Sequence, residues 1–295
     1  MTRSTGCPTD PARLGLRSSA WLLALVAALF LPGCLSGGGG GRTVLRTPSG
    51  PAMELASGLY LRGESLRTLA ARGGAGYSVA GKRHFFKFEA LVSKPGRLLF
   101  TALDPAGQPA FRLASDGQQL TGLIYSSRQF VTGPATAANF GRFIPLGLTP
   151  DELTVLMSGS QVRPAAAGAV ETGGATELVI VPAGHPDTEA GLWRLRLAGG
   201  LSQSPARAVI QSAALGPASR PEISIKYMSV KEVAREDQGG LAEPFPHTVE
   251  AAWTGGDRQN QSLRVTYDEV RLGLPLDGGV FHLEQPAGFE LVQLY

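Results

Sequence analysis

Short segments in which apolar and polar residues alternate dominate residues 84–130, and they constrain the fold more than any other feature. In the first segment, Phe86 and Phe88 share one face of a strand while Lys87 and Glu89 share the other. This alternation is typical of a strand with one apolar face and one face in water. The segments, separated by turn signals, read HFFKFEALVS, RLLFTALDPAGQPAFRL and QQLTGLIYSSRQF. They predict an antiparallel meander whose apolar face another layer must cover.

The same kind of pattern returns from Glu177 onward. The segments read ELVIV, LWRLRLA, ARAVIQSA, EISIKYMS, HTVEAAW, SLRVTYDEVRL, VFHLE and FELVQL. Residues 160–175 and 231–246 interrupt the pattern and are predicted to be exposed loops, and Asp268 and Glu269 are expected to mark a bulge or bend. The 39 Gly and 21 Pro suit many turns, and 295 residues can bury a sizeable core. The sequence predicts a mainly β fold, with one large antiparallel sheet that curves on itself and is covered by short helices.

The segment before the meander predicts a helix over residues 51–72. Leu55, Leu59, Leu66 and Leu69 fall near one stripe of such a helix, and two glycines follow it. The apolar stripe needs a packing partner, and the neighbouring sheet is the nearest one.

A second, shorter helix is predicted after the meander. Thr149-Pro150-Asp151-Glu152 forms a capping box with proline at the first helical position. The apolar residues Leu153, Leu156 and Met157 follow at helical spacing, and a Ser-Gly pair ends the segment. This amphipathic helix is a candidate lid for the sheet.

The N-terminal residues 1–33 predict a lipoprotein signal peptide. Arg13 and Arg17 precede an apolar run over residues 20–31, which is too short to span a bilayer by itself. The run ends in LPGC, which resembles a bacterial lipobox and implies cleavage after residue 33 and acylation of Cys34. An ordinary signal peptide followed by an incidental cysteine is the alternative.

Residues 34–50 combine the lipidated cysteine with a tether of five consecutive glycines, and residues 51–295 form the folded domain. Acyl chains on Cys34 would hold the protein at a membrane. Because Leu35 rather than aspartate follows the cysteine, the resemblance to bacterial lipoproteins favours the outer membrane, with the domain facing the periplasm.

The chain lacks the residue patterns of several function classes. After residue 33 it carries 24 basic and 23 acidic side chains, so no broad positive surface for nucleic acid is expected. Its four histidines are far apart and lack metal-ligand spacing, and no G-x-S-x-G, H-E-x-x-H or P-loop motif occurs. We therefore expect no enzymatic activity, no metal and no cofactor.

The order of these segments resembles the LolB outer-membrane lipoprotein-localisation family and its periplasmic relative LolA. The residues that carry the resemblance read PGRLLF, ALDPAGQPAFRLASDGQQL, SSRQFVTGPATAANFGRF and LTPDELTVLMSGS. The likeness covers residues 52–295 and is strongest over residues 81–159. It implies an open, strongly curved half-barrel of about eleven strands with a helical lid and an apolar cavity for acyl chains.

Twelve apolar residues are the candidate liners of that cavity. They are Phe86, Phe88, Leu98, Phe100, Phe111, Leu113, Leu120, Ile124, Ile223, Ile225, Leu263 and Val265. Alternation places them on one face of the predicted sheet. The alternative is that they form a dry core with no room for a ligand.

The resemblance also implies a protruding loop between two early strands. Asp104, Pro105, Ala106 and Gly107 match that loop, and Ala106 occupies the place of a bulky apolar residue. Alanine offers little apolar area to a bilayer, so this departure affects membrane insertion more than ligand binding.

The resemblance implies a lipoprotein that binds acyl chains and accepts or inserts lipoproteins at the outer membrane. Its partners would be lipid or lipoprotein acyl chains, the membrane that holds its anchor, and a LolA-like periplasmic carrier. The alternative function is that of a structural or assembly accessory that uses the same fold without lipid transfer.

Overall fold

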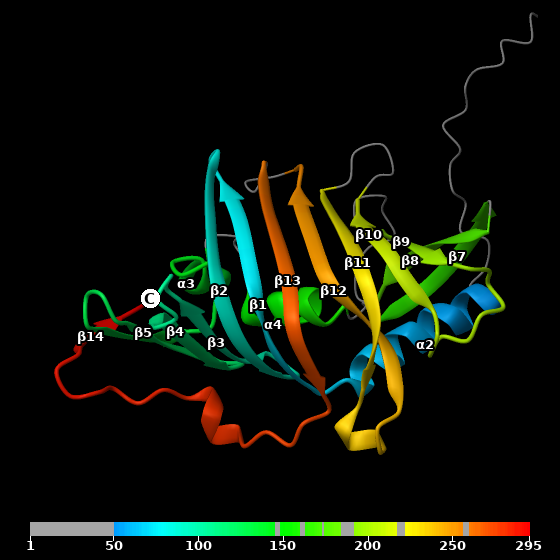
Figure 1. Cartoon of the computed structure of the whole chain (residues 1–295). Helices are drawn as coiled ribbons and strands as arrows, with labels where there is room; N and C mark the ends of the chain where they lie inside the picture. The colour runs from blue at the N-terminus through cyan, green and yellow to red at the C-terminus, as the bar shows by residue number, and fades with distance from the viewer. Residues whose placement is uncertain are drawn as a thin grey trace, which may run out of the picture. The chain divides into compact units, whose positions relative to one another are not determined.

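One sheet of 14 strands contains most of the backbone that the computed structural model describes (Figure 1). The structure describes residues 50–144, 148–159, 163–172, 174–183, 192–216, 222–255 and 260–295. The predicted signal peptide, Cys34 and all of the tether except Gly50 lie outside these ranges. Residues Leu45–Tyr295 form one compact unit that contains every described strand and the whole described core. This unit is therefore expected to fold by itself.

The sheet is built from strands that pair almost entirely in antiparallel fashion. Their bounds are β1 Thr68–Val79, β2 Lys82–Ser93, β3 Arg97–Leu103, β4 Pro109–Asp116, β5 Gln119–Ile124, β6 Gln129–Pro134, β7 Pro164–Thr172, β8 Ala175–Pro182, β9 Trp193–Ala198, β10 Val209–Leu215, β11 Ile223–Ala234, β12 Ala242–Trp253, β13 Gln261–Leu272 and β14 Glu290–Gln293. The spatial order is β14-β6-β5-β4-β3-β2-β1-β13-β12-β11-β10-β9-β8-β7, and only β14 lies parallel to its neighbour, β6. The predicted open, curved, mainly β fold is confirmed, with 14 strands rather than about eleven.

The first helix is shorter than predicted. The sequence predicts a helix over residues 51–72, but α2 spans Pro51–Ser65, and residues 68–72 belong to β1. Strand β1 pairs with β2 on one side and β13 on the other, so its backbone groups gain two ladders of hydrogen bonds. Leu66, which follows α2, and Leu69, on β1, are both buried in the same core cluster.

The predicted irregularity at Asp268 and Glu269 is confirmed as a β-bulge. Arg72 pairs with Glu269 while Gly73 pairs with Tyr267, which leaves Asp268 as the extra residue on β13. A side chain at Gly73 would collide with the carbonyl oxygen of Thr266, so glycine allows the two backbones to approach here.

Both predicted exposed loops are wrong in large part. Residues 164–172 form β7, an edge strand of the sheet that pairs with β8. Strands β11 and β12 extend through most of residues 231–246 and leave only a short turn that contains the 3-10 helix η3, Glu236–Gln238. The VFHLE segment is also no strand, since its first residues end the 3-10 helix η5, Gly278–Phe281.

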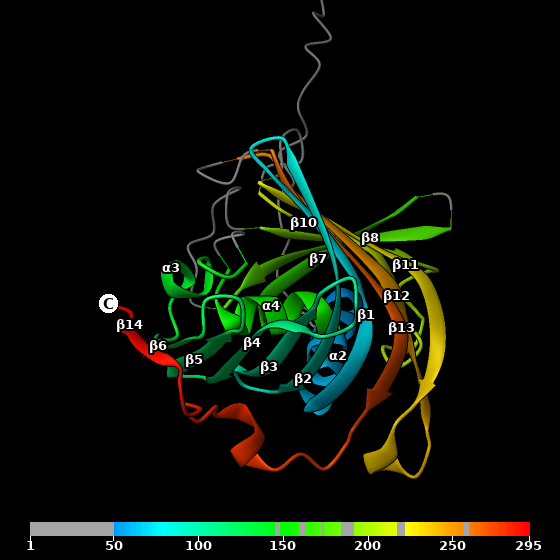
Figure 2. The same cartoon turned by 60° about the vertical axis from the view of Figure 1, so that its left-hand side comes forward.

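Three helices cover the inner, concave face of the sheet. Helix α4 spans Pro150–Ser158, and its capping box is present as predicted: the Thr149 amide donates to Glu152 Oε2 at 2.8 Å. Helix α4 contacts β3 and β12, while α2 packs on β7 and β8. The short helix α3, Ala137–Phe140, adds the buried ring of Phe140 to the same core. Figure 2 shows α2 and α4 lying inside the curve of the sheet.

The outer face of β3–β6 is covered by the chain that leads into β14, here called the C-terminal strap (residues 273–289; Figure 1). Phe281 and Leu283 of the strap pack against Leu99, Leu123 and neighbouring residues of the outer face. The predicted wet outer face is therefore wrong for this part of the sheet. Alternation in the early strands could not reveal a cover supplied by residues so distant in the chain.

Arg235 ties α2 to the β11–β12 hairpin. Its side chain is 2% exposed, and Nη2 donates to the Ser65 carbonyl oxygen and to Asp237 Oδ2, both at 2.7 Å. Nη1 donates to Ser65 Oγ at 2.8 Å and lies 3.5 Å from Glu243 Oε2. A buried guanidinium with this many partners fixes the end of the helix against the hairpin.

Replacing Arg235 by methionine is expected to lower the free energy of unfolding by about 3 kcal/mol, because the Asp237 and Glu243 carboxylates lose their buried counter-charge. Urea denaturation of Leu45–Tyr295 measures the change. The matched control is Arg207→Met, since the Arg207–Glu232 pair at 3.6 Å is exposed and should contribute less than about 0.5 kcal/mol. Equal effects of the two substitutions would contradict the anchoring role.

Candidate functional site

The candidate liners lie together on the concave face of the sheet and join one continuous apolar cluster. Eight of them are buried, namely Phe88, Leu98, Phe100, Leu113, Leu120, Ile225, Leu263 and Val265. The other four, Phe86, Phe111, Ile124 and Ile223, are partly exposed. The candidate liners thus share one face of the sheet, as their alternation in the sequence predicts. Acyl-chain binding to this face stays a prediction.

The four partly exposed liners share one end of their strands. This is the end at which the Ala80–Gly81 turn joins β1 to β2, and it is called the hairpin end below. Phe86 lies near the start of β2, Phe111 pairs with Ile124 at the end of β5, and Ile223 begins β11. Because strand directions alternate, these positions meet at the same edge of the concave face. Among the described residues, this face is therefore least covered at the hairpin end.

Aromatic rings run across the hairpin end in a line. Ring centroids are 6.1 Å apart for Tyr77 and Phe86, 6.0 Å for Phe86 and Phe100, 6.1 Å for Phe100 and Phe111, and 6.0 Å for Phe111 and Phe143. Of these five, only Phe100 is buried. The partly exposed members Tyr77, Phe86, Phe111 and Phe143 are called the aromatic rim.

Sequence reasoning missed two members of the aromatic rim. Tyr77 belongs to the glycine-rich β1, part of which the sequence predicts as a helix. Ala75, Tyr77 and Val79 recur at every second position, and this period indicates a strand with the three side chains on one face. Phe143 follows α3, outside any strand, and its ring packs directly over Gly122 of β5. No local pattern points to that contact.

Away from the hairpin end, the lid helix α4 fills the space above the sheet. Leu153, Leu156 and Met157 are 3%, 5% and 2% exposed and belong to the same cluster as the buried liners. Tyr267 on β13 donates its phenolic hydrogen to the Met157 carbonyl oxygen at 2.9 Å. Burial raises the pKa of Tyr267, so the phenol stays protonated and keeps this role.

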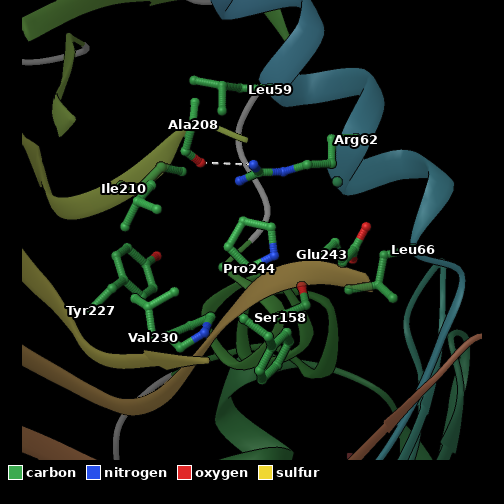
Figure 3. A pocket seen from close by; sticks show the side chains of 15 residues that line it. Leu59, Arg62, Leu66, Ser158, Ala208, Ile210, Tyr227, Val230, Glu243 and Pro244 are labelled. Carbon is green, nitrogen blue, oxygen red and sulfur yellow. Dashed lines mark hydrogen bonds between the residues drawn. The ribbon is translucent and has the colours of Figure 1, made fainter. Parts of the chain in front are cut away.

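One hollow lies between α2, the end of α4 and strands β10–β12, and it holds only about 40 Å³ (Figure 3). Arg62 closes it from α2 by donating through Nη1 to the carbonyl oxygens of Pro205 at 2.9 Å and Ala208 at 2.8 Å. Burial lowers the pKa of Arg62, and the Glu243 carboxylate opposes that change. The hollow has room for a water molecule or two and not for an acyl chain.

Two larger hollows bordered by described residues lie elsewhere. The first, of about 630 Å³, lies over the outer side of β1–β4 and is bordered by Leu91, Leu99 and Arg112. The second, of about 670 Å³, lies between the β1–β2 hairpin and the loop that follows β3. Of the candidate liners only Phe86 borders any of these three hollows. In this structure, α4 packs in the same apolar cluster as the buried liners.

The predicted protruding loop connects β3 to β4 and is exposed at Pro105, Ala106 and Gly107. Asp104 stabilises it, because Asp104 Oδ1 accepts from the Gln108 amide at 2.8 Å and the Asp104 amide donates to the Gln108 carbonyl at 2.8 Å. The loop is thus a compact turn that offers little apolar surface.

The described residues hold no group of three or more His, Cys, Asp or Glu side chains suited to binding a metal ion. None of the helices in the described ranges has the length and apolar character needed to traverse a bilayer.

No protein-family model and no curated protein sequence matches this chain. A solved DUF1329 family protein from Desulfovibrio piger is similar over 79% of this chain and 98% of its own length, with a TM-score of 0.51 and 10% identity. A putative outer membrane lipoprotein-sorting protein domain from Vibrio parahaemolyticus has a TM-score of 0.49 at 8% identity, covering 79% of this chain and 97% of its own. A LolA superfamily protein from Nitrosomonas europaea has a TM-score of 0.49 at 10% identity, covering 77% and 97%. The chain thus shares the curved-sheet fold of the DUF1329 protein.

Replacing Tyr267 by phenylalanine should loosen the lid helix. The change removes the hydrogen bond to Met157 and leaves a buried carbonyl oxygen at the end of α4 without this donor, at a cost of about 1–2 kcal/mol in unfolding free energy. Urea denaturation measures the cost. Tyr125→Phe is the control, because Tyr125 is 36% exposed and its loss should be close to zero. If both variants lost the same stability, Tyr267 would have no special role in holding α4.

Proposed function

We propose that the chain is an outer-membrane-anchored periplasmic lipoprotein of the LolB type, which binds acyl chains on its concave face. It would accept lipoproteins from a LolA-like carrier or insert them into the membrane, without covalent chemistry. The single observation that supports acyl binding best is the aromatic rim, because partly exposed rings at the open end of an apolar face can receive a hydrocarbon chain.

The lid helix α4 is the element that would move. It is short, and it lies over the buried liners through three apolar side chains. An acyl chain that enters at the aromatic rim would replace these contacts with its own methylene groups, each of which gains about 0.8 kcal/mol on burial. The contacts that α4 loses on moving would offset part of that gain, which suits a carrier that must also release its cargo.

A second candidate function is that of a structural or assembly accessory with a filled core. The specific observation in its favour is the small volume of about 40 Å³ left between α2, α4 and the sheet. Uptake of an acyl probe separates the two functions, because an accessory with a permanent core would take up none.

Leu45–Tyr295 is expected to bind a fluorescent fatty acid at about one molecule per chain, and Phe86→Ser should weaken this binding about tenfold because it removes apolar area from the aromatic rim. Fluorescence titration measures the dissociation constants. The matched control is Phe85→Ser, which removes the same side chain from the opposite face of the same strand, where Phe85 is 79% exposed.

Thermal unfolding of both variants checks that the fold is retained. No uptake by the unaltered protein would exclude the carrier function and favour the accessory. Equal weakening by Phe85→Ser and Phe86→Ser would place the probe outside the concave face.

The anchor is tested separately by Cys34→Ser in the full chain expressed in a Gram-negative bacterium. If Cys34 is acylated, the unaltered protein should sediment with outer-membrane fractions and the variant should lose most of that association. Mass spectrometry of the purified protein should show the added acyl mass on Cys34. An unmodified Cys34, or a variant that sediments equally, would contradict lipidation.

A further inference from the structure

The tip of the β1–β2 hairpin carries positive charge without compensating negative charge. Between Tyr77 and Phe88 the chain has Lys82, Arg83 and Lys87 and no aspartate or glutamate. All three cationic side chains are exposed, and none forms an ion pair with another described residue. Figure 2 shows the hairpin turn (cyan) at the extreme end of the curved strands.

An exposed aromatic ring lies among these charges. Phe85 is 79% exposed, and it points to the outer side of the sheet, opposite to Phe86. Its ring lies against Gly76, where a Cβ atom would come within 2.7 Å of it. The Phe85 ring therefore packs at a defined position on the surface, in space that is free because Gly76 has no side chain. A large ring held in water at this exposure indicates an interaction surface.

Phe85 also borders the hollow of about 670 Å³ together with the loop after β3. Gly74, Pro105 and Ala106 give the hollow apolar walls, and Lys87 stands at its border together with Arg264 and Asp104, whose opposite charges offset one another. Phe85 and the Asp104–Gly107 loop thus form one surface at the hairpin end.

We propose that this surface, called the docking tip and defined by Lys82, Arg83, Phe85 and Lys87, binds the surface of a bilayer that contains anionic phospholipids. The Phe85 ring enters the headgroup region, where aromatic side chains are favoured, and the three cations lie against lipid phosphates. The positive charge of the tip favours a negatively charged partner. The exposed Phe85 ring favours a partner with an apolar interior in which the ring can be buried. A bilayer provides both.

The docking tip does not depend on the acyl-chain site, although the two lie near one another. Tyr77 and Phe86 of the aromatic rim occupy the inner side of the same hairpin whose outer side carries Phe85. Docking by the tip would bring the rim close to the membrane surface. A lipidated Cys34 would hold the protein near a membrane without choosing its orientation, and the docking tip provides an orientation.

The test is sedimentation of Leu45–Tyr295, which lacks Cys34, with vesicles of phosphatidylcholine alone or with phosphatidylglycerol added in equal amount. Binding is expected to the acidic vesicles and to weaken strongly at high salt. Phe85→Ser should weaken it about fivefold to tenfold, and the triple variant Lys82→Ser, Arg83→Ser and Lys87→Ser should abolish it. Leu241→Ser is the control and should bind as the unaltered protein does, because Leu241 is an exposed apolar side chain (61%) in the turn between β11 and β12, outside both the docking tip and the aromatic rim.

A second measurement reports insertion directly. In Phe85→Trp, tryptophan emission should shift to shorter wavelength when acidic vesicles are added and should stay unchanged with neutral ones. Failure of the unaltered protein to bind acidic vesicles, or equal binding by Phe85→Ser, would overturn the proposal. Fatty-acid uptake involves no vesicles, so failure of the acyl-chain site would be seen separately.

Discussion

The pairing of β1 with β13 is the contact on which the rest of the structure depends. It runs from Leu69 opposite Leu272 to Ser78 opposite Ser262, and it joins the early strands β1–β6 to the later strands β7–β13 in one sheet. Without it, both halves would expose a long unpaired edge. The pairing also contains the bulge at Asp268, and bulges increase the local twist of a strand. The curvature that creates a concave face is therefore supported at the centre of the sheet.

Because the sheet is curved, different segments of the chain cover its two faces. The concave face receives α2, α3 and α4, and among the described residues it is least covered at the hairpin end. The outer face would be exposed, but the C-terminal strap covers its early part through Phe281 and Leu283. Strand β3 is consequently buried on both sides, with Leu98 and Phe100 inside and Leu99 and Thr101 outside. A strand covered on both faces does not show clean alternation, which explains the continuous apolar run Leu98-Leu99-Phe100.

The correct predictions rest on patterns among neighbouring residues. The errors concern segments whose structure depends on contacts with residues distant in the sequence. The capping box at Thr149 and the alternation in β2 depend on neighbouring residues, and both were predicted correctly. The predicted helix runs past Ser65 because Leu66 and Leu69 fit a helical stripe, whereas the pairing of residues 68–79 with β2 and β13 makes them a strand. The residues of the concave face are predictable from the sequence because alternation within each strand depends on neighbouring residues alone. Phe143 is not, because its place over Gly122 depends on how the segment after α3 folds back.

The pleat of β2 separates two surfaces that neighbouring residues would otherwise share. Phe85 and Phe86 follow one another in the chain, yet one lies against Gly76 on the outer side and the other against the Tyr77 ring on the inner side. A one-residue shift in the register of β2 would exchange them and would also turn Phe88 out of the core. The burial of Phe88, at 1% exposure, beside Phe100 therefore fixes the positions of both exposed rings. The same core contacts that stabilise the sheet thus hold Phe85 outward and Phe86 inward.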